Sequence, residues 1–237
     1  MVTKSGIKKE DNMEMGNRKI ILVTGFEPFG GEALNPAELV LEKLPDTIGG
    51  YQICKLLLPV EFMKARELVI AEYDRVSPAA VVMLGQAGRR DAITPETTAV
   101  NVMNAISSGK NLPDNAGFAP DHLPLVEGGS DILYATLPID KIVEAIKGAD
   151  IPCKVSDDAG KYVCNAVLYG MLAHNKGRVP TGFIHVPYMK EQGHEQYPYM
   201  ELDDICTGII KGIEAVAAEL DQTVTGELDQ MVAEEPG

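Results

Sequence analysis

The sequence of 237 residues lacks several features that mark specialised classes of protein. No run of about 18 apolar residues occurs, so we expect no helix that spans a membrane. The N-terminus, Met1 to Lys19, has no continuous apolar core of the kind found in secretion signals. Acidic residues outnumber basic ones by 35 to 21, and the formal charge of −14 disfavours binding to nucleic-acid phosphates. These absences predict a cytoplasmic protein that binds neither membranes nor nucleic acids.

Cysteine is scarce, and its spacing excludes two further classes of protein. The four cysteines are too few and too scattered for a disulfide scaffold or a C-x-x-C metal site; they are Cys54, Cys153, Cys164 and Cys206. The four histidines show no metal-ligand spacing such as H-x-x-x-H. We therefore predict no metal site, and reduced thiols of which any one could be reactive.

What the sequence does contain is the composition of a globular protein, 45% hydrophobic and 24% charged. Short β-branched runs alternate with segments of helical periodicity, which predicts an α/β fold: a three-layer α/β/α sandwich around a mostly parallel twisted sheet. We expect a flexible leader over residues 1–17, a single domain over 18–220 and an acidic tail over 221–237. The predicted strands are 20–24, 53–58, 79–84, 132–136, 153–155 and 181–186, and the predicted helices are 35–44, 62–73, 139–147, 160–174 and 203–219.

Ligands of parallel α/β folds bind at the carboxyl ends of the strands, so functional residues are expected in the loops that follow strands. The first such loop, residues 25–31, carries Phe26 and Phe29 among glycines and a proline. It lacks the G-x-G-x-x-G pattern of dinucleotide sites, so its rings either cap the core or form the apolar wall of a pocket. Asn35 is a candidate N-cap for the next helix, with Pro36 in its first turn.

The second loop, residues 85–90, combines small residues with Gln86 and is followed by Glu96. Small residues allow a ligand to approach the backbone, and a glutamine amide offers both a donor and an acceptor. A turn with solvated arginines and a surface glutamate is the alternative. The apolar residues on both sides of Glu96 favour a partly buried carboxylate, which would need a partner such as histidine.

The third segment, residues 155–165, places Cys164 in the first turns of a predicted helix that Ser156 or Asp157 could cap. Free N–H groups and the helix dipole stabilise a thiolate there, and a thiolate attacks carbonyl carbon if a base lies nearby. The alternative is an inert buried cysteine.

His185 is the histidine that ends a β-run, on the sheet edge where the helix of Cys164 begins. It is either a base for that thiol or a hydrogen-bonded core residue. The other histidines, His122, His174 and His194, lie in polar settings and are expected to be exposed.

Taken together, these segments resemble the pyroglutamyl peptidase I family, also called pyrrolidone carboxylate peptidases. The matching segments are T-G-F-E-P-F-G-G with N-P (24–36), G-Q-A-G with I-T-P-E and A-V-N (85–101), L-P-D-N (112–115), A-G-K-Y-V-C-N (159–165) and F-I-H-V-P-Y with E-Q (183–192). They follow the order of the family and cover residues 19–219, the predicted peptidase domain.

The resemblance implies removal of an N-terminal pyroglutamyl residue from peptides, through a thioester intermediate. It implies Cys164 as the nucleophile, His185 as the base and Glu96 as the carboxylate that orients the imidazole. Backbone N–H groups at the start of the Cys164 helix would form an oxyanion hole. This chemistry requires no cofactor. Family members often form homo-tetramers, and the same assembly is expected by analogy.

The resemblance also implies an apolar pocket for the pyrrolidone ring, lined by Phe26, Phe29, Tyr162 and Val163. The lactam has one N–H and one C=O, and the matching acceptor and donor would be the Gln86 backbone and the Asn35 side chain. Pairing both groups would reject a plain proline ring.

Three departures from the family pattern lie near the expected mouth of this pocket. Gly88-Arg89-Arg90 replaces G-G-R, Glu96-Thr97 replaces E-R, and Lys110-Asn111 replaces a family arginine after extra residues at 107–110. Two alternatives therefore stay open beside the peptidase: a cysteine amidase with another substrate preference, and an inactive protein that binds lactams.

Overall fold

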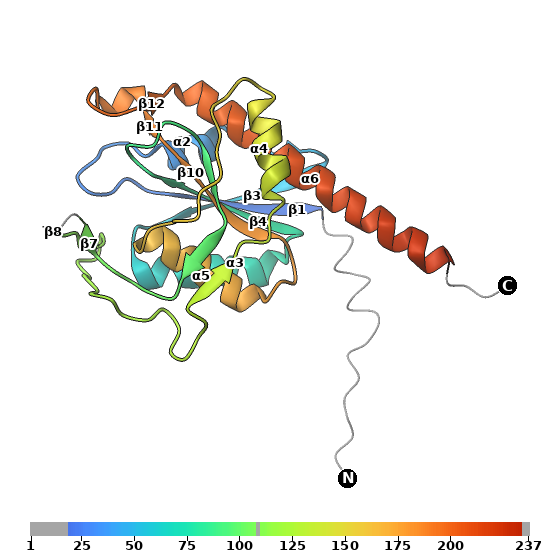
Figure 1. The fold of residues 1–237 in the computed structure, drawn as a ribbon, viewed down its shortest axis with the longest axis horizontal. Coiled ribbons are helices and arrows are strands. Elements are labelled where there is room, and N and C mark those ends of the chain that lie inside the picture. Colours follow the sequence, from blue (N-terminus) through green and yellow to red (C-terminus); the bar gives the residue numbers. More distant parts are fainter. Residues whose placement is uncertain (1–18, 108–109, 234–237) are drawn as a thin grey trace, which may run out of the picture.

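A central six-stranded sheet organises the computed structural model, which describes residues 19–107 and 110–233. Its strand order is β2-β3-β1-β4-β10-β5 (Figure 1). The strands are β1 (Ile20–Phe26), β2 (Thr47–Ile48), β3 (Tyr51–Leu58), β4 (Ala80–Gln86), β5 (Thr94–Glu96) and β10 (Thr181–Val186). The four inner strands are parallel, and β2 and β5 are antiparallel edges. The carboxyl ends of β1, β4 and β10 therefore meet at one edge of the sheet.

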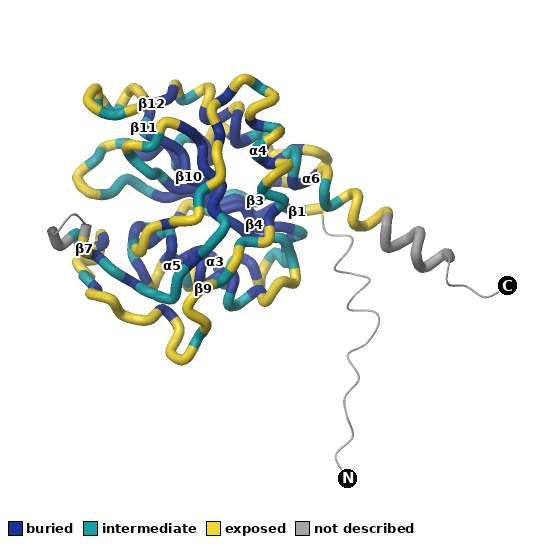
Figure 2. Tube along the Cα trace, in the orientation of Figure 1, coloured by how far each residue is buried: buried dark blue, intermediate teal, exposed yellow. Residues whose placement is uncertain are grey.

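Helices cover both faces of the sheet, so the predicted three-layer α/β/α architecture is confirmed (Figure 1). One face carries α2 (Pro36–Lys43), α4 (Ile139–Lys147) and α6 (Leu202–Ala233), and the other carries α3 (Phe62–Val76) and α5 (Val163–Asn175). Successive residues of a strand point to opposite faces. Ile21 and Val23 accordingly join the first core, whereas Leu22 and Phe26 join the second. Figure 2 shows the inner strands buried between these layers.

Short ladders lie outside the main sheet. They are β6 (Thr98–Val100) with β9 (Ile132–Tyr134), β7 (Ile106–Ser107) with β8 (Lys110–Asn111), and β11 (Tyr188–Met189) with β12 (Tyr199–Met200). A 3-10 turn, η1 (Lys190–Gln192), follows β11. Residues 112–131, between β8 and β9, form no helix or strand, in keeping with their Gly and Pro content.

The largest differences from the predicted element boundaries concern three segments. Helix α5 begins at Val163 rather than near residue 160, and its N-cap is Tyr162 without a side-chain cap. Residues 153–155 form no strand; Cys153 makes an isolated bridge to Ile93. Helix α6 continues to Ala233, because no proline interrupts the sequence before Pro236, so most of the segment predicted as a tail is helical. The predicted leader lies outside the described residues.

Neither a membrane span nor a metal centre is found within residues 19–107 and 110–233. No helix in these ranges is long and apolar enough to cross a membrane. No cluster of His, Cys, Asp or Glu side chains in them could hold a metal ion.

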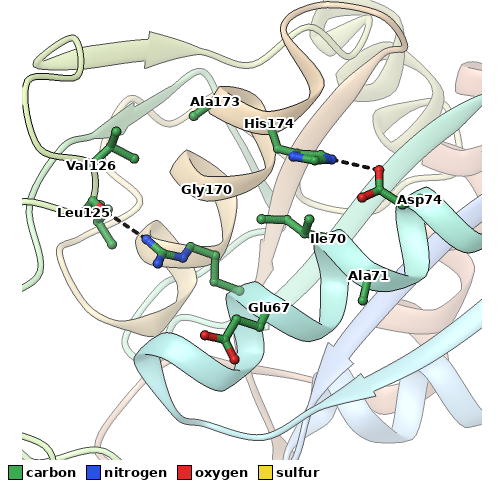
Figure 3. Close-up of a pocket in the computed structure, with 10 residues that line it drawn as sticks. Glu67, Ile70, Ala71, Asp74, Leu125, Val126, Gly170, Ala173 and His174 are labelled. Atoms are coloured by element: carbon green, nitrogen blue, oxygen red, sulfur yellow. Dashed lines mark hydrogen bonds and ion pairs between the residues drawn. The ribbon is translucent and has the colours of Figure 1, made fainter.

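A groove runs between α3 and α5 on one face of the molecule (Figure 3). The Arg66 side chain crosses from α3 over Gly170 of α5, where a larger residue would collide with it, and donates a 2.8 Å hydrogen bond to the Leu125 carbonyl. An ion pair of 2.8 Å joins His174 to Asp74 at the other end. None of the predicted site residues lines this groove.

Candidate active site

Cys164 is the second residue of α5 and lies over the carboxyl end of β4. A Cβ atom built on Gly85 would stand 2.9 Å from the Cys164 sulfur, so only glycine at this position leaves room for the thiol. Gly85 pairs across the ladder with His185 of β10. The sheet register thus brings the predicted nucleophile and the predicted base to the same point.

His185 and Glu96 form a direct hydrogen bond, 2.7 Å from Nδ1 to Oε1. The edge strand β5 runs antiparallel to β10, with Glu96 opposite Phe183 and Thr94 opposite His185. Glu96 and His185 are therefore diagonal neighbours on one face of the sheet. A carboxylate only accepts, so Nδ1 carries the proton and Nε2 remains as the basic nitrogen.

Arg90 also contacts Glu96, and this role of Arg90 was not predicted from the sequence. Its Nη1 donates to Oε1 of Glu96 at 2.6 Å and also contacts the Thr94 hydroxyl. Its Nη2 donates to the backbone carbonyl of Asp158 at 2.8 Å. Glu96 is fully buried, and a buried carboxylate needs such a charged donor to remain ionised.

The local environment sets the protonation state of each of the three groups. Burial acts to raise the pKa of Glu96, but the hydrogen bond from His185 and the charge of Arg90 hold it below its usual value. Burial lowers the pKa of His185, against the opposing effect of Glu96. Burial and the negative charge of Glu96 raise the pKa of Cys164 to about 12. At neutral pH the resting site therefore holds a carboxylate, a neutral imidazole and a protonated thiol.

A small cavity opens beside the thiol. We call it the Cys164 cavity; it is lined by Phe26, Phe29, Asn35, Val60, Gln86, Tyr162, Val163 and Cys164. All six residues predicted to bind the pyrrolidone ring surround this cavity. Val60 was not predicted, because nothing in the sequence sets it apart from other core valines.

The two polar residues of the Cys164 cavity are held in different ways. Asn35 caps α2: its Oδ1 accepts from the Ala37 N–H at 3.0 Å, and its Nδ2 donates to the Glu27 carbonyl at 3.0 Å. This confirms the predicted N-cap and leaves one Nδ2 hydrogen available. Pairing between β1 and β4 ends at Met83. The backbone of Gln86 is therefore unpaired on the side that faces β1, although Gln86 stays in register with Val186 of β10.

Hydrogen bonds tie residues 112–115 to segments that border the cavity. Tyr162 donates its hydroxyl to the Pro113 carbonyl at 3.0 Å. Asn115 donates to Oε1 of Glu27 at 3.1 Å and to the Pro28 carbonyl at 3.2 Å. The L-P-D-N segment thus contacts Tyr162, which lines the cavity, and the loop that follows β1.

Two expectations about individual side chains were wrong. Ser156 and Asp157 do not cap α5; Ser156 instead bridges to Glu96 through the backbone. His194 is only 23% exposed, because it packs on the Tyr188 ring at 4.2 Å and pairs with Glu32 at 2.9 Å. The bridge of Ser156 to Glu96 and the pairing of His194 with Glu32 join segments distant in the chain, for which the sequence carries no local signal.

Comparisons with known proteins all point to one family. The family model described as pyroglutamyl peptidase matches residues 19–219. A pyrrolidone-carboxylate peptidase of Lactobacillus helveticus is 42% identical over 201 residues, covering 83% of this chain and 98% of that protein. One from Thermococcus onnurineus is 43% identical over 189 residues, covering 78% and 92%. The crystal structure of pyroglutamyl peptidase I from Bacillus amyloliquefaciens superposes with a TM-score of 0.80 at 34% identity, covering 84% of this chain and 95% of that one.

Proposed function

The chain belongs to the pyroglutamyl peptidase family, and we propose that Cys164, His185 and Glu96 are the residues with which it acts. The protein is a hydrolase, a cysteine exopeptidase that removes an N-terminal pyroglutamyl residue from peptides. The observation that carries the residue assignment is the hydrogen bond between His185 and the buried Glu96, next to the thiol over Gly85.

Catalysis begins with proton transfer from the Cys164 thiol to Nε2 of His185. Because the resting thiol is protonated, this transfer accompanies attack of the sulfur on the amide carbon that follows the pyroglutamyl ring. Glu96 stabilises the imidazolium that forms and keeps Nδ1 protonated. The oxyanion accepts hydrogen bonds from backbone N–H groups at the start of α5, which have no partner within the helix.

The tetrahedral intermediate collapses when the imidazolium of His185 protonates the leaving amine, which releases the shortened peptide. The acyl group remains on Cys164 as a thioester. His185 then takes a proton from water, the hydroxide attacks the thioester carbon, and the thiol recovers its proton as pyroglutamate departs. The protons that move in these steps come from the Cys164 thiol and from the attacking water, so the mechanism requires no cofactor.

Recognition of the lactam ring follows from the walls of the Cys164 cavity. The aromatic and aliphatic side chains of the cavity cover the faces of the ring. The free Nδ2 hydrogen of Asn35 is oriented by two backbone contacts, and it donates to the lactam carbonyl. The Gln86 backbone carbonyl, outside the β1 ladder, accepts from the lactam N–H. A proline ring would leave the Asn35 donor unpaired, which costs binding.

The direct test is release of a chromophore from a pyroglutamyl amide by purified protein in the presence of a thiol reductant. Cys164→Ala is expected to abolish release, whereas Cys206→Ala, a buried cysteine of α6, keeps activity. Activity in Cys164→Ala would refute the assignment of the nucleophile. A preference for prolyl or glutaminyl amides would favour the amidase alternative, and Cys164 inert to iodoacetamide would favour the inactive binder.

Two further properties belong to the proposal. The protein acts in a reducing compartment, the cytoplasm, because oxidation of Cys164 would remove the nucleophile. It assembles as a homo-tetramer, by analogy with its family. Light scattering on the purified protein measures the assembly, and a monomer would contradict it.

A further inference from the structure

Gln192, in the turn η1, joins two segments that border the Cys164 cavity. Its Nε2 donates to Oε1 of Gln86 at 2.8 Å and to the Leu34 carbonyl at 3.3 Å. Its Oε1 accepts from the Met189 N–H at 3.1 Å. One half-buried side chain therefore holds three backbone or side-chain groups at once.

The orientation of this amide is determined by the backbone. A backbone N–H can only donate and a backbone carbonyl can only accept, so Oε1 of Gln192 faces Met189 and Nε2 faces Leu34. The Gln86 side chain must then present its oxygen to Nε2. The Gln86 side-chain oxygen thus anchors the end of its strand.

The two anchored segments carry the two predicted polar contacts to the lactam. Leu34 immediately precedes Asn35, and Gln86 is the last residue of β4. Because β1 and β4 are not paired beyond Met83, no ladder hydrogen bond sets the separation of these ends. The bridge through Gln192 is the polar link that does so among the described residues.

We propose that Gln192 is a positioning residue for lactam recognition, which holds the Asn35 donor and the Gln86 backbone acceptor at the separation that the ring requires. The proposal rests on the proposed function of the Cys164 cavity. The hydrogen bonds of Gln192 go to Met189, Leu34 and Gln86, and none goes to a residue of the proposed Cys164, His185 and Glu96 triad. Loss of Gln192 therefore weakens binding of the ring without removing the reactivity of the thiol.

Binding of 2-pyrrolidone, the bare lactam, measures this effect as competitive inhibition of pyroglutamyl amide cleavage. In Gln192→Ala we expect the inhibition constant and KM to rise about tenfold, with a smaller change in kcat, because the Asn35 donor and the Gln86 acceptor are no longer held at a fixed separation. The rate of Cys164 alkylation by iodoacetamide stays at its original value. Glu191→Ala, an exposed neighbour in η1, is the matched control and keeps both constants.

Two further variants separate positioning from a general structural role. Gln192→Glu keeps the acceptor for Met189 but has no donor, so it is expected to lose lactam binding at least as strongly as the alanine variant. If Gln192 acts through Gln86, the combined loss in a Gln86→Ala/Gln192→Ala double variant is smaller than the product of the single losses.

Three results would overturn the proposal. They are an unchanged inhibition constant in both Gln192 variants, a fall in thiol alkylation as large as the fall in lactam binding, and fully multiplicative losses in the double variant. An unmutated protein that neither cleaves the pyroglutamyl amide nor binds 2-pyrrolidone would refute the proposed function itself, together with the role of Gln192.

Discussion

Substitution Gly85→Ala tests whether the thiol position seen over β4 is the working one. The new Cβ would stand 2.9 Å from the Cys164 sulfur and 2.7 Å from Cζ of Phe183. Favourable contacts between such atoms begin near about 3.5 Å, so the sulfur and the ring must each move by roughly 0.6 to 1 Å. A misplacement of about 1 Å costs on the order of 100-fold in rate, and overpacking costs about 1–3 kcal/mol of stability.

The assay is kcat/KM for a pyroglutamyl amide, measured together with urea unfolding. Gly182→Ala is the matched control, because its Cβ would stand 2.8 Å from Leu137 Cδ1 in the other core. Both variants are expected to lose stability, but only Gly85→Ala should lose about 100-fold in kcat/KM of the folded protein. Full activity in Gly85→Ala would refute the placement of the thiol against this glycine.

Three other predictions concern the groups around the thiol. Arg90→Met removes a cation that, together with burial, lowers the pKa of His185. The acid limb of kcat/KM should therefore move to higher pH, and kcat should fall about tenfold. An acid limb at the original pH would contradict the role of Arg90. The pKa values of His185 and Glu96 are both lowered in the folded protein, so the free energy of unfolding should fall as pH drops below 6.5 and again below 4.5. A urea midpoint that stays constant from pH 7 to pH 4 would contradict this pH dependence. Asn165→Ala breaks three buried hydrogen bonds beside β6 and should cost about 3 kcal/mol in urea unfolding; a loss below about 1 kcal/mol would show that water replaces them.

Elements with a strong local signal were predictable from the sequence. The β-branched run at 181–186 and the helical period at 139–147 gave the bounds that the structure has. Both segments are defined by their own side chains: β10 is a short continuous run buried on both faces, and the apolar residues of α4 recur on one face of the helix. Asn35 was predictable as a cap for the same reason, because its partner is the backbone two residues later.

The parts that depend on contacts between distant segments were not predictable in this way. From the residues alone, Glu96 and His185 each had a structural alternative, and the resemblance to a family was needed to join them with Cys164. The role of Arg90 depends on the turn after β4, which returns its guanidinium to Glu96. The bridge made by Gln192 joins positions more than 100 residues apart, for which no local pattern exists.

The position of β10 has a consequence for how the molecule acquires activity. Residues 181–186 lie between β4 and β5, whose facing ends, Gln86 and Thr94, are close in the chain. The chain must therefore be synthesised through residue 186 before β10 can insert between β4 and β5 and complete the sheet. Pairings with such long sequence separation form slowly, since the loop entropy is lost before the contacts are gained. Enzyme activity should appear in refolding only with the slowest phase, and a nascent chain that has not yet exposed Val186 outside the ribosome should be inactive.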